Sequence, residues 1–220
     1  MLKRISQIIK SNYHFLLLIS LMFVFRSAVA DWSDVPTGSM NPTIVEGDRI
    51  LINKMAYDLR LPFTHISLLK RADPERGDIV IFDSAVSDIR LVKRVIGLPG
   101  DRIAMQHNQL QVNGKTLSYQ LTTEQALTTE AVEHLTVPAH HISHIVRRNK
   151  QRSYYGDFAE VTVPENHYLV LGDNRDNSAD SRVIGFVPRD EIVGRSRMVV
   201  ASLDYDNYFL PRKERFFKTL

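Results

Sequence analysis

The sequence predicts a mainly β protein whose strands form several antiparallel sheets, with a small subdomain inserted between core strands. Two observations support this fold class. From Val35 onward, apolar and polar residues alternate with a period of two more often than they follow a helical period. In addition, a Gly-Asp pair precedes three short apolar runs, which is typical of a turn that leads into a strand. These pairs are Gly47-Asp48, Gly77-Asp78 and Gly100-Asp101.

The predicted strands follow from these apolar runs in chain order. They cover residues 49–52, 79–82, 90–96, 102–105, 110–112, 116–119, 159–163, 167–171 and 192–202. The segment Leu98-Pro99-Gly100-Asp101 fits a type II turn, with Pro second and Gly third. Asn113-Gly114 is typical of a two-residue hairpin turn. Residues 62–76 are expected to form an exposed loop between two core strands.

Residues 106–158 differ in composition from the sequence on either side. They are rich in Thr, Gln and His, and they contain the charged patch 147–152. We interpret them as the inserted subdomain, with a short helix within 122–135, and we assign 31–105 and 159–220 to the main β domain. Four histidines between His134 and His144 could bind a metal, but no acidic or cysteine partner has a motif spacing to them. A solvated loop is therefore the preferred interpretation there, and no metal site is expected.

Composition excludes several classes of protein. With 220 residues, 44% of them hydrophobic, the chain can bury a full globular core. A net charge of +3 is too small to indicate a nucleic-acid partner. The chain has no Cys, which excludes disulfides, thiolate catalysis and cysteine metal sites. The basic and aromatic segment 212–218 could touch anionic lipid, but a solvated tail is the preferred interpretation.

The N-terminal 30 residues have the pattern of a membrane-targeting segment. Lys3, Arg4 and Lys10 precede the apolar run 13–25, and no acid lies before it. This basic flank predicts a cytoplasmic N-terminus with the rest of the chain across the membrane. Two interpretations compete. Ala28-Val29-Ala30 resembles the cleavage site of a secretory signal. Alternatively, the run is a retained anchor in which Arg26 snorkels, although it is short against the ~20 residues that a spanning helix needs.

A candidate nucleophile lies just after this segment, in Pro36-Thr37-Gly38-Ser39-Met40-Asn41-Pro42-Thr43. The two prolines restrict the backbone, and Gly38 permits a conformation or a close approach that a side chain would forbid. A rigid loop that displays one serine can hold a nucleophile. An ordinary turn has the same composition, so this stretch alone leaves both interpretations open.

Lys93 is the candidate base, because none of the eight histidines lies in a compact catalytic signature. In a strand, Lys93 shares a face with Leu91 and Val95. A lysine on an apolar face is desolvated, which lowers its pKa from ~10.4 and lets it accept a proton. Pairs of serine and lysine are an established alternative to the Ser-His-Asp triad. A snorkelling or ion-paired lysine is the ordinary alternative.

A third stretch, 172–182, packs three Asp, two Asn, two Ser and two Arg after an apolar strand. The two arginines argue against a calcium loop. We interpret it as an internally bridged loop, through Asp180 with Arg182 or Asp173 with Arg175, in which Ser178 could orient a lysine amine. A polar surface turn is the alternative.

Together these stretches resemble type I signal peptidase, the membrane-anchored Ser-Lys protease family. The matching motifs are 36–43, 76–82, 93–101 and 172–185, and they occur in the family's order. The resemblance implies that Ser39 is the nucleophile and Lys93 the general base. It also implies an oxyanion hole made of the Ser39 N–H and the Thr37 hydroxyl, where the family often has a serine. Ser178 would orient the lysine amine, and Asp180 with Arg182 would form a supporting ion pair.

The same resemblance implies the substrate and the cellular setting. Shallow apolar pockets for small substrate residues would be lined by Val35, Pro36, Ile44, Leu91 and Val92. Residues 1–30 would be a retained single-pass anchor in the bacterial cytoplasmic membrane, with the β domain on the extracytoplasmic side. The expected partners are signal-peptide-bearing precursors and the lipid bilayer, with no cofactor, no metal and no nucleic acid, and the protein is expected to be a monomer.

Two other functions stay open on the sequence. One is a specialised signal-peptidase-like protease of a conjugation or secretion system that matures pilin-type precursors. The other is a non-catalytic, membrane-anchored β domain that only binds peptides. Self-cleaving repressors share the Ser-Lys chemistry, but they carry a DNA-binding domain and lack a membrane segment, which is the opposite pattern to this chain.

Overall fold

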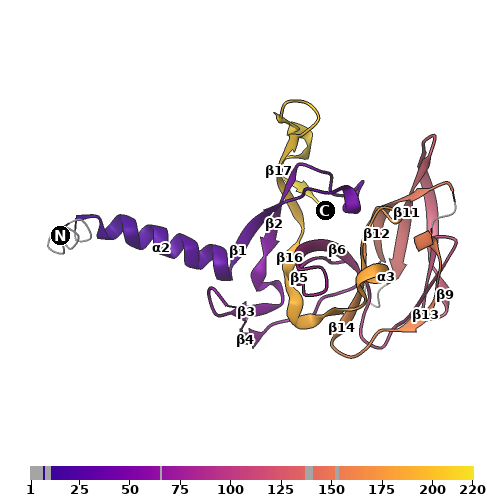
Figure 1. Ribbon diagram of the computed structural model, residues 1–220, viewed down its shortest axis with the longest axis horizontal. Helices are drawn as coiled ribbons and strands as arrows, with labels where there is room; N and C mark the ends of the chain where they lie inside the picture. Colours follow the sequence, from indigo (N-terminus) through magenta and orange to yellow (C-terminus); the bar gives the residue numbers. More distant parts are fainter. Residues whose placement is uncertain (1–6, 8–10, 65, 137–140, 152–153) are drawn as a thin grey trace.

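The computed structural model describes residues 7, 11–64, 66–136, 141–151 and 154–220, which form one long helix and many short strands (Figure 1). The helices are α2 (Tyr13–Ala28), η1 (Gly38–Met40), η2 (Lys54–Ala56), η3 (Tyr154–Gly156), α3 (Ser181–Ile184), η4 (Arg189–Glu191) and η5 (Lys213–Arg215). The strands up to the middle of the chain are β1 (Ala30–Asp34), β2 (Asp48–Asn53), β3 (Asp58–Arg60), β4 (Ser67–Lys70), β5 (Ile79–Ser84), β6 (Ile89–Gly97), β7 (Arg102–Gln106), β8 (Gln109–Val112), β9 (Lys115–Thr116) and β10 (Ser118–Glu124). The remaining strands are β11 (Thr128–Thr136), β12 (His141–Asn149), β13 (Phe158–Thr162), β14 (His167–Leu171), β15 (Val187–Pro188), β16 (Ile192–Ser196), β17 (Met198–Asp204), β18 (Leu210–Pro211) and β19 (Lys218–Thr219).

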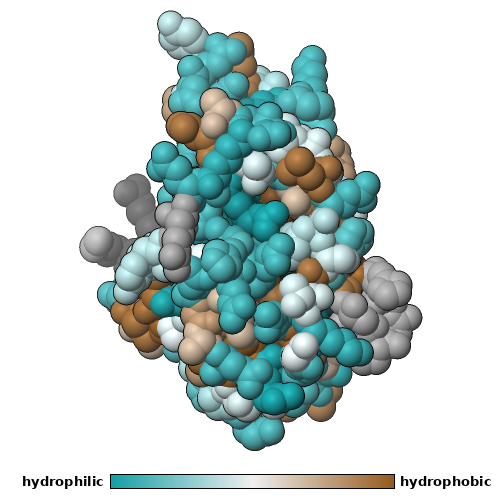
Figure 2. All heavy atoms as spheres, turned by 90° about the vertical axis from the view of Figure 1, so that its right-hand side faces the viewer, coloured by the Kyte–Doolittle hydropathy of each residue, from teal (hydrophilic) through white to brown (hydrophobic). Residues whose placement is uncertain are grey.

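The largest sheet has the strand order β15-β14-β6-β5-β16-β2-β17-β18, with β1 also paired to β2 and β19 to β17. Its strand pairs are antiparallel, as the sequence predicts. Three smaller antiparallel sheets have the orders β10-β11-β12, β13-β7-β8-β9 and β3-β4. The face that carries the two middle-sized sheets is mainly hydrophilic (Figure 2), while Ile103, Leu110 and Leu135 of these sheets are fully buried in one cluster.

Strand β6 is covered on both faces, which confirms the alternation predicted around Lys93. On one face Val92 packs against a buried cluster that includes Met40, Ile44 and Ile81. On the other face Leu91 and Val95 belong with a second cluster around Phe82 and Val170. A side chain in the middle of this strand therefore lies in a dry environment.

The turns predicted from Gly and Asn are present. Gly47, Gly77 and Gly100 all have positive φ, at 86°, 93° and 83°. At the third of these turns the Asp101 N–H donates to the Leu98 carbonyl over 2.9 Å, as in a type II turn. Asn113 and Gly114, with φ of 51° and 76°, join β8 to β9 in the conformation that two-residue hairpins favour.

The helix predicted within 122–135 is wrong, because this segment contains the end of β10 and most of β11. In β11 the inward-facing residues are Ala131, Glu133 and Leu135, all buried. Because the middle of these three residues, Glu133, is charged, the sequence does not show the apolar alternation that is typical of a strand. The exposed loop predicted at 62–76 is also wrong in part, because it contains β4, and the strand predicted at 192–202 is divided into β16 and β17.

The prediction of a solvated C-terminal tail is wrong in part: most of residues 212–218 are exposed, but the segment is not a free tail. It contains η5 and the first residue of β19, which pairs with β17. The Arg215 guanidinium binds the fully buried carboxylate of Asp48 over 2.5 Å and the Thr43 carbonyl over 3.1 Å. Thr43 is the last residue of the predicted nucleophile stretch. The C-terminal segment therefore holds the end of that stretch through Arg215.

The solvated histidine loop is likewise wrong, because His134 lies on β11 and the buried His144 on β12. His140 lies outside the described residues, and so do Arg152, Lys3, Arg4 and Lys10 of the predicted basic segments.

Helix α2 projects away from the β-sheets (Figure 1), and most of its large apolar side chains are exposed. Among the residues that the structure describes, no helix combines the length and the hydropathy needed to cross a membrane. At its end, Arg26 binds Asp31 over 2.7 Å and lies 4.2 Å from the ring centroid of Trp32. The segment Ala28-Val29-Ala30 joins α2 to β1, and Ala28 is buried.

Candidate active site

Ser39 lies in the middle of the one-turn helix η1, which the stretch 36–43 forms. Thr37 precedes the turn with extended backbone angles, φ −133° and ψ 151°. Met40 and Ile44 are buried on the core side and anchor the stretch, while Ser39 itself is only half-buried. Ser39 is therefore displayed on a short 3-10 turn, and its neighbours Met40 and Ile44 are buried in the core.

Asn174 fastens this turn to the loop 172–182. Its backbone N–H donates to the Ser39 carbonyl over 3.0 Å, and its side-chain Nδ2 donates to the Gly38 carbonyl over 2.9 Å. Sequence reasoning missed this role. A side-chain amide that binds main-chain carbonyls leaves no motif in the sequence. The one available indication was the position of Asn174 in a polar loop that follows an apolar strand.

Lys93 reaches Ser39 from β6. Its Nζ donates to the Ser39 Oγ over 2.9 Å and to the Val92 carbonyl over 3.0 Å, and the residue is 2% exposed. Desolvation by this burial lowers the pKa of Lys93 to about 8, while the negative charges of Asp180 and Asp173 act in the opposite direction. A lysine with this pKa exists partly as the neutral amine near pH 8, so it can accept a proton.

Asp180 and Arg182 form the predicted ion pair. The carboxylate accepts from the Arg182 Nη2 over 2.7 Å and from the Gly172 N–H over 2.9 Å. Arg182 also donates to the carbonyl oxygens of Tyr155 and Arg175. The ion pair thus links the two ends of the loop 172–182, close to Lys93.

The alternative pair of Asp173 with Arg175 is wrong. Asp173 binds Arg94 through two hydrogen bonds of 2.8 and 2.7 Å, and it accepts from the Thr43 hydroxyl over 2.6 Å. Arg175 instead reaches Glu133 on β11. The sequence showed one cation on each face of β6, but it gave no sign that Arg94 would bind a loop nearly eighty residues away.

Gly172 separates Ser39 from Ser178. A Cβ built on Gly172 would lie 2.5 Å from the Ser39 carbonyl oxygen and 2.3 Å from the Ser178 Oγ, so a side chain has no room there. The Ser178 Oγ is buried and has no hydrogen-bond partner among the described residues. The predicted orientation of the Lys93 amine by Ser178 is therefore not a hydrogen bond in this conformation.

The residues predicted to line the substrate pockets lie at different depths. Val35 and Ile44 are buried in the core cluster that Val92 packs against. Leu91 packs against the cluster on the other face of β6, and Pro36 is exposed. Pro36 is thus exposed and Leu91 and Val92 are half-buried, whereas Val35 and Ile44 lie inside the core.

Within the described part of the chain, no group of three or more His, Asp and Glu side chains could hold a metal ion. His144 lies beside Glu133 and Asp173, but Arg175 and Arg94 bind these two carboxylates.

A serine on a braced turn, bonded to a buried lysine of lowered pKa, is the arrangement of hydrolases that use a lysine as general base. A comparison with known protein families identifies which group of these hydrolases the chain belongs to. The family described as signal peptidase, peptidase S26, matches residues 7–201, and the chain belongs to this family.

Curated relatives agree with the assignment. The chain is 35% identical over 188 residues to signal peptidase I of Pseudomonas aeruginosa, covering 80% of this chain and 66% of that protein. It is 33% identical to the Pseudomonas fluorescens enzyme of the same name, with the same coverage. It is 34% identical over 207 residues to signal peptidase I of Rickettsia typhi, covering 84% of this chain and 77% of that protein. The chain therefore spans just under two thirds of the length of the two Pseudomonas relatives.

Proposed function

We propose that this protein is a serine endopeptidase that removes N-terminal signal peptides from secreted precursors by means of a Ser39–Lys93 dyad. The observation that carries the proposal is the 2.9 Å contact between the Ser39 hydroxyl and the amine of Lys93, a residue that is 2% exposed. Membership of the signal peptidase family supports the substrate class. The lowered pKa of Lys93 supports its role as the base.

The proposed reaction begins when the neutral Lys93 amine takes the proton of Ser39 while the Oγ attacks the scissile carbonyl carbon. With the pKa of Lys93 at about 8, roughly a tenth of the amine is neutral at pH 7, against less than about a thousandth for a free lysine. The protonated Lys93 then gives its proton to the leaving amine as the C–N bond breaks. Water, activated by Lys93, hydrolyses the acyl-enzyme, releases the signal peptide and restores the Ser39 hydroxyl.

The oxyanion hole is assigned to the Ser39 N–H and the Thr37 hydroxyl. An N–H at the start of a helical turn has no acceptor within that turn, so the Ser39 N–H can bind a substrate oxygen. The Thr37 side chain makes no capping bond to η1 and belongs to an exposed residue. Each such donor contributes about 3 kcal/mol to transition-state stabilisation in related chemistry.

Three residues are assigned supporting roles. Asp180 and Arg182 hold the loop against the dyad, and Asp180 also stabilises the protonated form of Lys93. Ser178 is assigned the orientation of the Lys93 amine, for which its hydroxyl would have to rotate from its present unbonded position. For the substrate, we assign the binding of small residues, as in an Ala-x-Ala segment, to the pockets formed by Val35, Pro36, Ile44, Leu91 and Val92.

We further propose that residues 1–30 are a single-pass anchor, and that the β domain lies on the extracytoplasmic side of the cytoplasmic membrane as a monomer. The exposed apolar surface of α2 supports a lipid contact. The β3–β4 hairpin lies beside the end of α2, where the Phe63 N–H donates to the Ser27 Oγ over 2.6 Å. This hairpin also exposes large apolar side chains, among them Phe63, Ile66 and Leu69. The division into residues 31–105 with 159–220 and an inserted 106–158 is part of the same proposal.

The test is cleavage of a secretory precursor by the purified full chain in detergent, with the cut located by mass spectrometry. We expect one cut after an Ala-x-Ala-like segment, and loss of nearly all cleavage in Ser39→Ala and in Lys93→Ala. Normal cleavage by Ser39→Ala would remove the dyad from the mechanism. A folded wild-type chain that binds the precursor without cutting it would instead establish the non-catalytic peptide-binding function, and cleavage confined to pilin-type precursors would establish the specialised one.

A further inference from the structure

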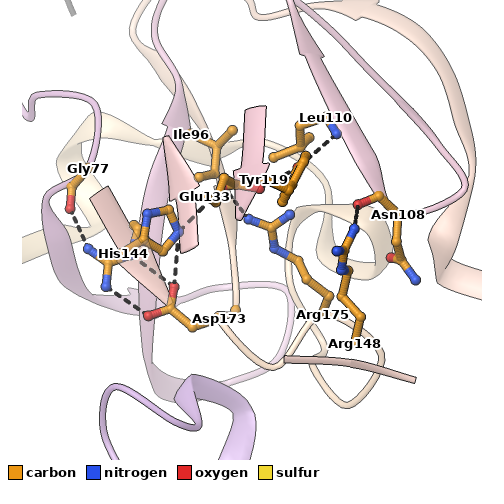
Figure 3. Close-up of polar contacts among 12 residues, drawn as sticks. Gly77, Ile96, Asn108, Leu110, Tyr119, Glu133, His144, Arg148, Asp173 and Arg175 are labelled. Atoms are coloured by element: carbon orange, nitrogen blue, oxygen red, sulfur yellow. Dashed lines mark hydrogen bonds and ion pairs between the residues drawn. The ribbon is translucent and has the colours of Figure 1, made fainter. Parts of the chain in front are cut away.

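Glu133 is a buried carboxylate far in sequence from the dyad. It lies on the inner face of β11 and is 0% exposed. It accepts a hydrogen bond from the Arg175 Nη2 over 2.5 Å and another from the Tyr119 hydroxyl over 2.5 Å (Figure 3). The His144 Nε2 lies 3.4 Å from the same carboxylate. The proposed catalytic chemistry makes no use of this carboxylate, yet its burial as a charge needs a partner to offset the loss of hydration.

The partner charge is Arg175, which is 1% exposed. His144 does not compete as a cation, because burial and the positive charge of Arg94 lower its pKa to about 4. Asp173 is matched by Arg94 in the same way. Two carboxylates and two guanidiniums thus balance one another in a dry site, and removing the charge of Glu133 would leave Arg175 unmatched.

Arg175 belongs to the segment 173–175, which β12 also binds through its backbone. The Arg147 N–H donates to the Asp173 carbonyl over 2.8 Å, and the Arg175 N–H donates to the Arg147 carbonyl over 2.9 Å. These bonds form an isolated parallel bridge between Arg147 and Asn174. The β10–β12 sheet therefore binds the segment 173–175 through the buried pair of Glu133 with Arg175 and through two backbone hydrogen bonds of Arg147.

The opposite side of the same segment holds the nucleophile, since Asn174 donates to the carbonyl oxygens of Ser39 and Gly38. A continuous path of short contacts therefore runs from Glu133 through Arg175 and Asn174 to Ser39. A displacement of about 1 Å in a reacting group can cost about a hundredfold in rate. The orientation of Arg175 is thus important for the reaction although it touches no reacting atom.

We propose that Glu133 is a positioning residue: its charge fixes Arg175, and through the segment 173–175 it sets the place of Ser39 relative to Lys93. This inference rests on the proposed role of Ser39 as nucleophile. It gives the β10–β12 sheet a function in catalysis, because that sheet supplies the anchor for the loop. Tyr119 adds a second contact, since its hydroxyl both donates to Glu133 and accepts from the Leu110 N–H over 3.0 Å.

The test compares Glu133→Gln with Glu130→Gln in the full chain. Glu130 is the matched control, because it lies on the same strand and its carboxylate also binds an arginine side chain. That arginine is Arg147 of the same sheet, at 2.7 Å, and not a residue of the segment 173–175. We expect kcat on a precursor peptide to fall at least tenfold in Glu133→Gln with KM within twofold of wild type, at a temperature where circular dichroism shows the variant folded. Glu130→Gln should keep kcat within twofold.

Two results would overturn the inference: a folded Glu133→Gln with wild-type kcat, or an equal loss in Glu130→Gln. If Glu133→Gln does not fold, Glu133→Asp decides, because its shorter side chain withdraws the carboxylate from the Arg175 guanidinium. A threefold or larger loss of kcat in Glu133→Asp supports the inference, and an unchanged kcat overturns it. Ser39→Ala in the same assay separates the two proposals. An active Ser39→Ala variant would refute the assignment of Ser39 as nucleophile. An inactive Ser39→Ala variant together with a normal Glu133→Gln variant would refute only the positioning role of Glu133.

Discussion

The main chain of Ser39 is held by Asn174, whose N–H donates to the Ser39 carbonyl over 3.0 Å. The Asn174 side chain holds the Gly38 carbonyl next to it, across a sequence separation of 136 residues. Because these bonds use carbonyl oxygens, they leave the Ser39 hydroxyl to Lys93 and the Ser39 N–H to a substrate. The turn is thus immobilised without occupying its reactive groups.

Gly172→Ala should disable this arrangement. The added Cβ would meet the Ser39 carbonyl oxygen at 2.5 Å, so the turn or the loop has to shift. We expect a loss of about a hundredfold in kcat. Gly114→Ala is the control: its φ of 76° is strained for alanine, but nothing lies within 4 Å of the new Cβ, so activity should be unchanged. Equal activity of the two variants would contradict the close approach at Gly172.

Thr37→Val should remove one oxyanion donor and keep the shape of the side chain. The expected loss is about a hundredfold in kcat with little change in KM, because the donor acts on the developing charge. Thr37→Ser restores a hydroxyl and should retain most of the activity. Steady-state kinetics on a precursor peptide check this, and a Thr37→Val enzyme with normal kcat would leave the oxyanion hole to the Ser39 N–H alone.

Lys93→Met should stabilise the protein at neutral pH. The folded-state pKa of Lys93 is lowered from 10.5 to about 8, so the unfolded chain binds the proton more tightly between these values. Stability therefore rises with pH in that window, and below pH 8 the folded state bears a cost of up to about 3 kcal/mol. The gain from Lys93→Met should be largest below pH 8 and vanish above about pH 10.5. Urea unfolding at pH 7 and at pH 10.5 measures it, and a gain that is the same at both values would contradict the buried-lysine account.

Asp180→Asn should move the activity profile towards lower pH. The carboxylate of Asp180 raises the pKa of Lys93, so its neutralisation should let the amine lose its proton at a lower pH. The variant also leaves Arg182 without its buried partner, which should cost about 3–5 kcal/mol of stability. Kinetics are therefore taken at a low temperature where the variant is folded. A profile that stays in place or moves upward would show that Asp180 does not act on Lys93.

The sequence was a good guide wherever a local rule decides the structure. The glycines at 47, 77 and 100 required positive φ, and the apolar residues on both sides of Lys93 required a strand covered on both faces. The pairing of Ser39 with Lys93 was predicted only through the resemblance to type I signal peptidase, because each stretch taken alone also fitted an ordinary turn or an ion-paired lysine.

Long-range charge pairing was not predictable in the same way. Arg175 could pair with Asp173 two residues away, yet in the fold it binds Glu133, because the fold buries both side chains against each other. The same buried charge broke the apolar alternation of β11 and led to the wrong helix. The C-terminal Arg215 has no sequence signal that would match it to Asp48. Such pairs depend on which strands become neighbours, and a single sequence does not contain that information.

The most direct test of the central claim, that Lys93 is the base for Ser39, is the pH dependence of kcat/KM between pH 5 and pH 10. This profile reports the pKa of the essential base in the free enzyme. With the pKa of Lys93 at about 8, kcat/KM should fall about tenfold per pH unit below pH 8 and level off above it. A midpoint near 6.5, as for an ordinary histidine, or a flat profile across pH 8 would contradict the account.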